Sequence, residues 1–418
     1  MIFARDTYIN QLAQKKQNGM IKIITGLRRC GKSYLLFKLF YDKLVAEGVP
    51  KSHIIKIPLD DLEFAALRDK MALYKFIKSK IKDKKQYYCL LDEIQLVEGF
   101  EEVLNSLLHI ENVDVYVTGS NSRFLVKDVI TEFRGRGDEI RMYPLSFKEY
   151  YEMRKDDFAS AWTDYYTYGG LPLVATMKTH KEKSDYLGGL FSKVYLTDVI
   201  DRYNIRNKTE FEELLDVVAS SIGSLTNPMK IENTFKTKEK STITNKTITS
   251  YLMHLEDAFL IQTAERFDIK GRKHIGANKK YYFTDIGLRN ARLNFRQIEE
   301  SHIMENVIYN ELKFRGYNVD VGVIEYNSKD KNGKSQKTQL ECDFVANLGN
   351  EKIYMQSALN IADEKKKEQE EKSLLKINDS FKKIIVQKEK TVPHYDENGI
   401  YIVCLEDFLM GRKVRRKD

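Results

Sequence analysis

A glycine-rich segment near the amino end has the residue types and the spacing that phosphate binding requires. It reads Gly26-Leu-Arg-Arg-Cys-Gly31-Lys32-Ser33 and matches the pattern G-x-x-x-x-G-K-S/T in full. The glycines let backbone amides face phosphate oxygens, Lys32 brings a positive charge to the outer phosphates, and the Ser33 hydroxyl completes the coordination of Mg²⁺. An apolar run at 21–25 precedes the segment and a helical pattern follows at 34–41, which is the context that the pattern needs.

The segment therefore predicts a site for a nucleoside triphosphate with Mg²⁺, and we take the nucleotide to be ATP. The positive end of the helix that follows adds to the attraction for phosphate. The residues that we expect to contact the nucleotide are Gly26, Leu27, Arg28, Arg29, Cys30, Gly31, Lys32, Ser33 and Tyr34.

Two further strand tips carry polar side chains. The apolar run at 87–91 ends in Asp92 and Glu93. In a parallel sheet, such a strand would deliver Asp92 to the metal shell and place Glu93 where it polarises the attacking water. The alternative is that the pair only caps the next helix.

The third apolar run, at 113–118, is followed by Gly119-Ser-Asn121-Ser. A polar side chain at this strand tip would contact the γ-phosphate or the water, and we prefer Asn121 over Thr118 for this role. The alternative is an N-cap for a helix that begins near Ser122.

The elements that must position these residues alternate along the first 150 residues. Apolar runs occur at 20–25, 53–59, 87–91 and 113–118, and helix-like stretches lie between them at 33–47, 61–82 and 100–110. Strands that alternate with helices predict an α/β fold with a parallel sheet covered on both faces.

Composition excludes several classes of protein. With 42% hydrophobic and 31% charged residues among 418, the chain is not disordered. We expect no membrane span and no signal peptide, because no stretch of about 18 uncharged apolar residues occurs and the first residues turn polar at once. Four scattered cysteines form no metal spacing and no disulfide framework, which predicts a cytoplasmic location. The net charge of +8 suits a nucleic-acid partner and a lysine-rich cytosolic enzyme equally.

Beyond residue 150 the pattern is helical to about 210, with a break at Tyr168-Gly-Gly-Leu-Pro172. Helices at 211–222 and 244–257 then precede strands at 260–266 and 280–284, joined by a basic stretch at 270–280, which together suggest a winged helix. Such a module binds DNA or docks a protein. The cations that would reach DNA from the hairpin are Lys270, Arg272, Lys273, His274, Lys279 and Lys280; the second helix would add Thr244, Asn245, Lys246, Thr247 and Thr249.

From about 301 the layout is that of a restriction-type nuclease, with Glu305 on a helix, Asp343 opening a strand, and a further strand at 352–357. Such a site needs two acidic metal ligands and a lysine that orients or activates water.

Several strings together resemble a known family, the prokaryotic AAA-type ATPases, which are similar to origin-recognition-type and archaeal ATPases. The strings are GLRRCGKS, LLDEIQ, VTGSNSRFL, FRGR with YPLSFKEY, YGGLP, KVYLTDVIDR and YFTDIGLRNA, and they span nearly the whole chain. The resemblance implies a P-loop ATPase core at 1–150, a helical connection at 151–210, a winged helix at 211–300 and a restriction-endonuclease-like domain at 301–418.

The resemblance also implies roles that spacing does not. Arg134 and Arg136 match the family's arginines after the third strand, where an arginine is presented to the nucleotide of a neighbouring subunit. We prefer Arg136 as this finger, and a homo-oligomer follows from it. The alternative is a surface arginine, or one paired with Asp138 or Glu139.

Family members also carry an acid-x-Lys triplet on the last nuclease strand, where this chain reads Gln356-Ser-Ala358. Because Ala358 cannot replace an ammonium group, we expect the nuclease-like domain to be catalytically inactive, and nothing supports Lys352 as a substitute.

The hypothesis that follows is an oligomeric AAA-type ATPase that hydrolyses ATP with Mg²⁺ and couples hydrolysis to binding or remodelling of double-stranded DNA. The first alternative is a nucleotide-controlled signalling switch or protein remodeller that acts without DNA. The second alternative is an ATP-driven DNA nuclease.

Overall fold

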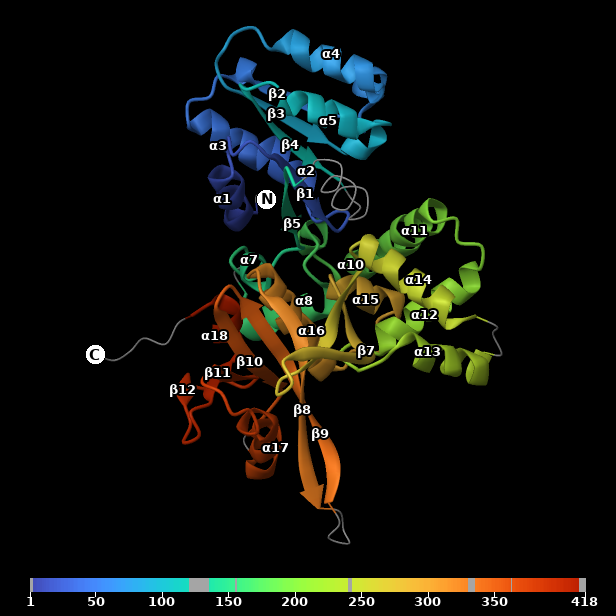
Figure 1. The fold of residues 1–418 in the computed structure, drawn as a ribbon, viewed down its shortest axis with the longest axis vertical. Helices are drawn as coiled ribbons and strands as arrows, with labels where there is room; N and C mark the ends of the chain where they lie inside the picture. The colour runs from blue at the N-terminus through green and yellow to red at the C-terminus, as the bar shows by residue number, and fades with distance from the viewer. Residues whose placement is uncertain are drawn as a thin grey trace, which may run out of the picture. The chain divides into compact units, whose positions relative to one another are not determined.

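The computed structural model describes residues 3–119, 135–154, 156–239, 243–329, 335–361 and 363–412. Contacts divide the chain into two compact units (Figure 1). The amino-terminal unit comprises Met1–Pro144, Leu171–Thr176 and Asp257–Leu260, and the carboxy-terminal unit comprises Leu145–Gly170, Met177–Glu256 and Ile261–Asp418. The finer division at 150, 210 and 300 stays a prediction.

The amino-terminal unit is built on a five-stranded sheet in the order β2-β3-β4-β1-β5. The strands are β1 (Ile21–Gly26), β2 (Ile54–Pro58), β3 (Tyr87–Asp92), β4 (Val113–Thr118) and β5 (Gly137–Met142). Every neighbouring pair is parallel, so the predicted parallel α/β sheet is confirmed. The strand β5 was not expected, because its charged residues hide the apolar pattern.

Helices cover both faces of this sheet. Figure 1 shows α4 and α5 on one side of the strands and α1 and α3 on the other. Their bounds, with the shorter turns, are α1 (Asp6–Gln14), α2 (Lys32–Tyr34), η1 (Leu35–Phe40), α3 (Tyr41–Ala46), η2 (Lys51–His53), η3 (Leu62–Arg68), α4 (Lys70–Lys80), η4 (Ile94–Leu96), α5 (Phe100–Leu108) and α9 (Pro172–Ala175). All six residues of β1 and of β3 are buried, as expected for strands covered on both faces.

Helices dominate the first half of the carboxy-terminal unit, as the sequence predicts. The helices and helical turns of the whole unit are α7 (Phe147–Tyr151), α8 (Phe158–Tyr168), α10 (His180–Leu190), η6 (Phe191–Leu196), α11 (Thr197–Arg202), α12 (Lys208–Ser220), α13 (Pro228–Thr234), η7 (Phe235–Glu239), α14 (Asn245–Asp257), α15 (Ile286–Arg292), α16 (Glu300–Phe314), α17 (Glu364–Leu375) and α18 (Leu405–Met410). None of the helices in the described ranges is long and apolar enough to cross a membrane.

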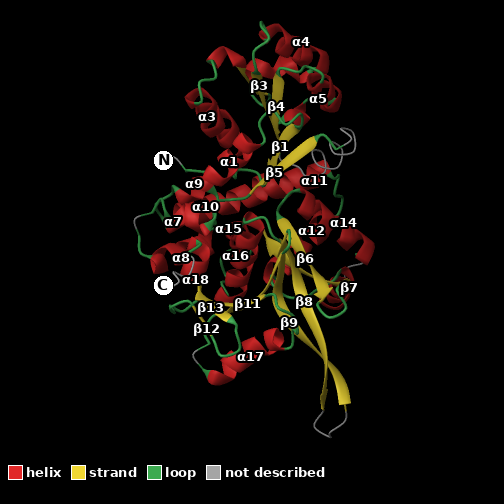
Figure 2. Ribbon diagram, turned by 60° about the vertical axis from the view of Figure 1, so that its left-hand side comes forward, coloured by secondary structure: helices red, strands yellow, loops and turns green. Residues whose placement is uncertain are grey.

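The second sheet is mixed and has eight strands in the order β12-β13-β11-β10-β9-β8-β6-β7. The strands are β6 (Ile261–Asp268), β7 (Lys273–Phe283), β8 (Asn318–Lys329), β9 (Ser335–Leu348), β10 (Glu351–Ala358), β11 (Lys382–Gln387), β12 (His394–Tyr395) and β13 (Tyr401–Cys404). In Figure 2 the strands β8 and β9 extend together beyond the rest of the sheet.

The hairpin β6–β7 belongs to this sheet, because β6 also pairs with β8 in parallel. The prediction that residues 270–280 form only a basic connection is wrong, since β7 begins at Lys273, which pairs with Asp268 on β6. Glycine and lysine hide the strand pattern at 273–280, and only pairing across the hairpin stabilises it as a strand.

The YGGLP and TDIGLRN strings interlock within the carboxy-terminal unit. Asp285 accepts hydrogen bonds from the backbone amides of Gly170 (2.8 Å) and Leu288 (3.0 Å), so it caps α15 and holds the turn at the same time. A Cβ atom on Gly287 would lie 2.1 Å from the carbonyl oxygen of Tyr168. The close approach of two backbones explains why glycine occupies this helix position.

We expect the variant Gly287→Ala to lower the free energy of unfolding of the carboxy-terminal unit by about 1–3 kcal/mol, because overpacking forces the two backbones apart. The matched control is Gly189→Ala on α10, where an added Cβ meets nothing within 4 Å and alanine adds up to about 1 kcal/mol of helix stability. Urea unfolding followed by circular dichroism measures both. Equal midpoints for the two variants would contradict the close approach.

Candidate nucleotide site and acidic cluster

The glycine-rich segment forms a tight loop between β1 and α2. Gly26 ends β1 with φ of 136°, and Gly31 precedes α2 with φ of 102°. A Cβ atom on Gly26 would lie 2.1 Å from the carbonyl oxygen of Met142, its partner on β5. Only glycine fits this position. The segment runs from a strand through a loop into a helix, which is the path that phosphate binding needs.

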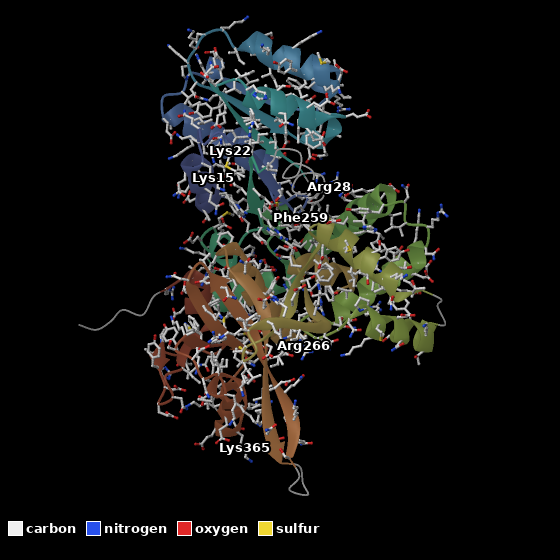
Figure 3. All side chains as sticks on the ribbon, viewed as in Figure 1. Lys15, Lys22, Arg28, Phe259, Arg266 and Lys365 are labelled. Carbon is white, nitrogen blue, oxygen red and sulfur yellow. The ribbon has the colours of Figure 1, made fainter. Side chains whose placement is uncertain are left out.

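Lys32 folds back onto its own loop. Its Nζ donates hydrogen bonds to the carbonyl oxygens of Gly26 (2.9 Å) and Leu27 (3.1 Å), and the side chain is buried. Phosphate oxygens carry more negative charge than carbonyl oxygens, so a bound triphosphate would offer this ammonium group a stronger partner. Arg28, labelled in Figure 3, belongs to the same loop.

Ser33 and Asp92 meet at the carboxyl edge of the sheet, as the two patterns predict. Asp92 is buried, its carboxylate accepts a hydrogen bond from the hydroxyl of Thr118, and the hydroxyl of Ser33 lies near enough to favour its ionised form. Burial raises the pKa of Asp92 above its usual range, and the two hydroxyls oppose the rise. The pair suits Mg²⁺, which proteins often bind through one carboxylate and one hydroxyl while water and phosphate fill the other positions.

Glu93 follows β3 in a left-handed conformation, with φ of 52°. Its amide donates to the hydroxyl of Thr118 (3.1 Å), and its carboxylate accepts a hydrogen bond from the side-chain amide of Gln95. Its side chain does not cap the turn that follows, so the capping alternative has no support from Glu93.

Thr118 was not our preferred residue, yet it joins Asp92 and Glu93. Leu91 pairs with Val117 across β3 and β4, which brings Thr118 opposite Asp92. Thr118 is the last residue of the third apolar run, which could have pointed to it. The sequence does not say which strand lies beside that run. Asn121 and Arg134 lie outside the described residues.

Arg136 lies just before β5, at the end of the sheet opposite to the glycine-rich loop. Its carbonyl oxygen accepts from the amide of Ile21 at the start of β1 (2.9 Å), and its side chain is exposed. The carboxylates proposed as alternative partners are engaged elsewhere, since Asp138 pairs with Lys15 and Glu139 accepts from Thr25. Arg136 therefore does not reach the phosphate loop of its own chain.

An apolar cavity of about 240 Å³ adjoins the loop within the amino-terminal unit. Cys30, Gly31 and Tyr34 line it from the loop side. The opposite walls come from Phe3, Met142, Pro172 and Leu173. Its apolar lining suits a nucleobase beside the phosphates. Sequence patterns missed it because its walls come from four distant segments.

Lys280 was predicted to reach DNA, and this prediction is wrong. Its side chain is 2% exposed, and its Nζ lies 2.8 Å from Glu305, 2.6 Å from Glu341 and 3.6 Å from Asp343. Burial alone would lower the pKa of Lys280, but the three carboxylates outweigh burial and raise the pKa. An ammonium group thus fills the centre of this acidic cluster.

The other hairpin cations are also partly engaged. Lys279 pairs with Glu265 (2.7 Å), and His274 lies 3.2 Å from Asp320. Lys273 is exposed.

The nuclease-like layout is assembled in part. Asp343 accepts from the amide of Ser357 (2.9 Å), and its own amide donates to the side-chain oxygen of Gln356 (3.1 Å). Lys352 lies over the rings of Phe267 and Phe381 instead of entering the cluster. Among the described residues, no three His, Cys, Asp or Glu side chains are arranged to hold a metal ion.

Comparisons with known proteins agree on the amino-terminal half. A family model described as "AAA domain" matches residues 18–151, and a model described as a domain of unknown function matches residues 159–299. An uncharacterized protein of Haemophilus influenzae is 33% identical over 418 residues, covering 98% of this chain and 99% of that protein. An uncharacterized protein of Methanocaldococcus jannaschii is 28% identical, covering 76% of this chain and 70% of that protein.

Two solved structures are also similar. The Aeropyrum pernix Orc1 protein in complex with DNA is 13% identical with a TM-score of 0.28, covering 70% of this chain and 92% of that chain. Cdc6p of Pyrobaculum aerophilum is 12% identical with a TM-score of 0.30, covering 73% of this chain and 94% of that chain. Scores this low carry no conclusion about binding or activity.

The acidic cluster predicts a pH dependence of stability. Burial and the neighbouring charge of Glu305 raise the pKa of Asp343 from 3.8 to about 7. A raised folded-state pKa gives stability that is complete below about pH 4 and is lost as the pH rises through 7. We therefore expect Asp343→Asn to flatten the fall in melting temperature between pH 4 and 7. The exposed control Glu368→Gln should keep the slope of the natural chain, and an unchanged slope in Asp343→Asn would refute the assignment.

Proposed function

Because the chain belongs to the family of AAA-type P-loop proteins that includes the Haemophilus influenzae relative, we propose that it binds ATP with Mg²⁺ and hydrolyses ATP to ADP and phosphate. The observation that carries the proposal is the contact of Ser33 with Asp92 beside the glycine-rich loop. A hydroxyl and a buried carboxylate at this position would hold Mg²⁺, which neutralises charge on the phosphates when bound.

The roles of the remaining residues follow from their positions. Lys32 exchanges its two carbonyl partners for phosphate oxygens, and the loop amides bind the other phosphate oxygens. Glu93, one residue beyond Asp92, accepts the proton of the attacking water. The apolar cavity between the loop, Phe3 and Leu173 would accept a purine base such as adenine, because purine faces gain more from apolar walls than from water.

We also propose a homo-oligomer. The position of Arg136 at the far end of β1 and β5 means that its guanidinium could serve only the nucleotide of a neighbouring copy. An arginine that reaches a transferring phosphoryl group across an interface stabilises the developing charge. Arg134 is the other candidate for this role.

Coupling to double-stranded DNA is the favoured purpose. The helices α12, α13 and α14 precede the hairpin β6–β7, and Thr226 pairs with Lys279 in an additional bridge, an order that suits a winged helix. Lys246 on α14 and Lys273 on the hairpin are exposed and would contact phosphates.

One observation favours another purpose, and a second argues against the nuclease. Met229 on α13 is 60% exposed and Met253 on α14 is 40% exposed, and exposed methionines suit protein docking, so a nucleotide-controlled switch or protein remodeller is the second candidate. An ATP-driven nuclease is disfavoured, because Lys280 fills the acidic cluster where a metal ion would have to bind.

All four cysteines are free and buried, which supports a cytoplasmic location.

We expect Lys32→Ala to abolish binding of magnesium-ATP in calorimetry, because the mobile charge on the outer phosphates is lost.

Glu93→Gln should bind magnesium-ATP with a Kd close to that of the natural chain, while kcat for phosphate release falls by about 100-fold or more. A Glu93→Gln variant that turns over ATP at the natural rate would remove Glu93 from the mechanism.

For the DNA hypothesis, the test is Lys246→Glu combined with Lys273→Glu. Duplex binding measured by fluorescence anisotropy should weaken, and the slope of log K against log salt should fall by about 2, because two phosphate contacts are lost. The control is Lys365→Glu with Lys366→Glu on α17, where Lys365 lies at the lower end of the carboxy-terminal unit in Figure 3. Unchanged affinity in the first variant would favour protein docking.

A further inference from the structure

The glutamine of the LLDEIQ string contacts the proposed catalytic base. Gln95 lies in the short turn η4, two residues after Glu93, and its Nε2 donates a hydrogen bond to Oε2 of Glu93. Both side chains are half-buried. A hydrogen bond from a side-chain amide restrains the orientation of a carboxylate.

The backbone of this turn fixes where the two side chains point. The Glu93 carbonyl accepts from the amide of Leu96 (3.0 Å), the Ile94 carbonyl accepts from Val97 (3.0 Å), and the Glu93 amide donates to Thr118 (3.1 Å). These bonds hold Glu93 in the left-handed region, which is unfavourable for a residue with a side chain. The turn is therefore rigid, and it leaves only the side-chain torsions of Glu93 to be restrained.

The other end of the Gln95 amide is unsatisfied within the described part of the chain. Its Oε1 is buried and accepts no hydrogen bond from any residue that the structure describes, which lowers stability. Rotating the amide would direct Oε1 at the carboxylate of Glu93, where two acceptors repel. For stability alone, an apolar side chain of similar size would serve this position better.

We infer that Gln95 is a positioning residue, which restrains the carboxylate of Glu93 for proton transfer from the attacking water. The inference rests on the proposed function, since it concerns the same site. A displaced base loses rate steeply with distance. The unsatisfied Oε1 atom is the stability cost of this restraint.

The test is Gln95→Leu in the full chain, with magnesium-ATP as the probe. We expect kcat to fall by about 10- to 100-fold, the Kd for magnesium-ATP to stay within about twofold, and the melting temperature to stay equal or rise.

A matched control is Gln86→Leu, at the other end of β3, where a half-buried glutamine donates only to the Tyr87 carbonyl; it should keep the natural kcat. In the double variant Gln95→Leu with Glu93→Gln, turnover should equal that of Glu93→Gln alone, because Gln95 acts through Glu93.

An unchanged kcat in Gln95→Leu, or a kcat that falls together with the melting temperature and the affinity, would overturn the positioning role and leave the ATPase standing. A natural chain that binds ATP without turnover would overturn the proposed hydrolysis first, and the role of Gln95 with it.

Discussion

The contact between Ser33, Asp92 and Thr118 is the interaction on which the amino-terminal unit depends. Three strands bring these residues together only because β1, β3 and β4 are parallel and end at one edge of the sheet. Covering both faces with helices makes the edge the one place where polar groups can gather. The apolar core thus determines where the chemistry can occur.

The two acidic sites treat buried charge differently. In the amino-terminal unit, two hydroxyls face the carboxylate of Asp92, and burial raises its pKa. In the carboxy-terminal unit, Lys280 lies among three carboxylates and supplies the cation from within the chain. The first carboxylate is stabilised by hydroxyl groups, and the second set by an ammonium group.

A nucleotide would have to replace the two loop carbonyls that bind Lys32, whereas Glu93 keeps its contacts with Thr118 and Gln95. The close packing of Gly26 against Met142 keeps the loop itself in place. Binding can thus proceed with side chains exchanging partners on a fixed backbone, which lowers the entropy lost on binding.

Local patterns in the sequence were enough to identify the glycine-rich loop, the acidic pair and the four apolar strands, because each signal lies within a few neighbouring residues. The tertiary structure alone placed Thr118 against Asp92, Lys280 in the acidic cluster, and Phe3 with Leu173 around one cavity. Strand neighbours and cavity walls arise from contacts between distant segments, and a single sequence carries no direct record of which segments meet. The polar strand β5 was missed for the same reason, since only its pairing with β1 makes it a strand.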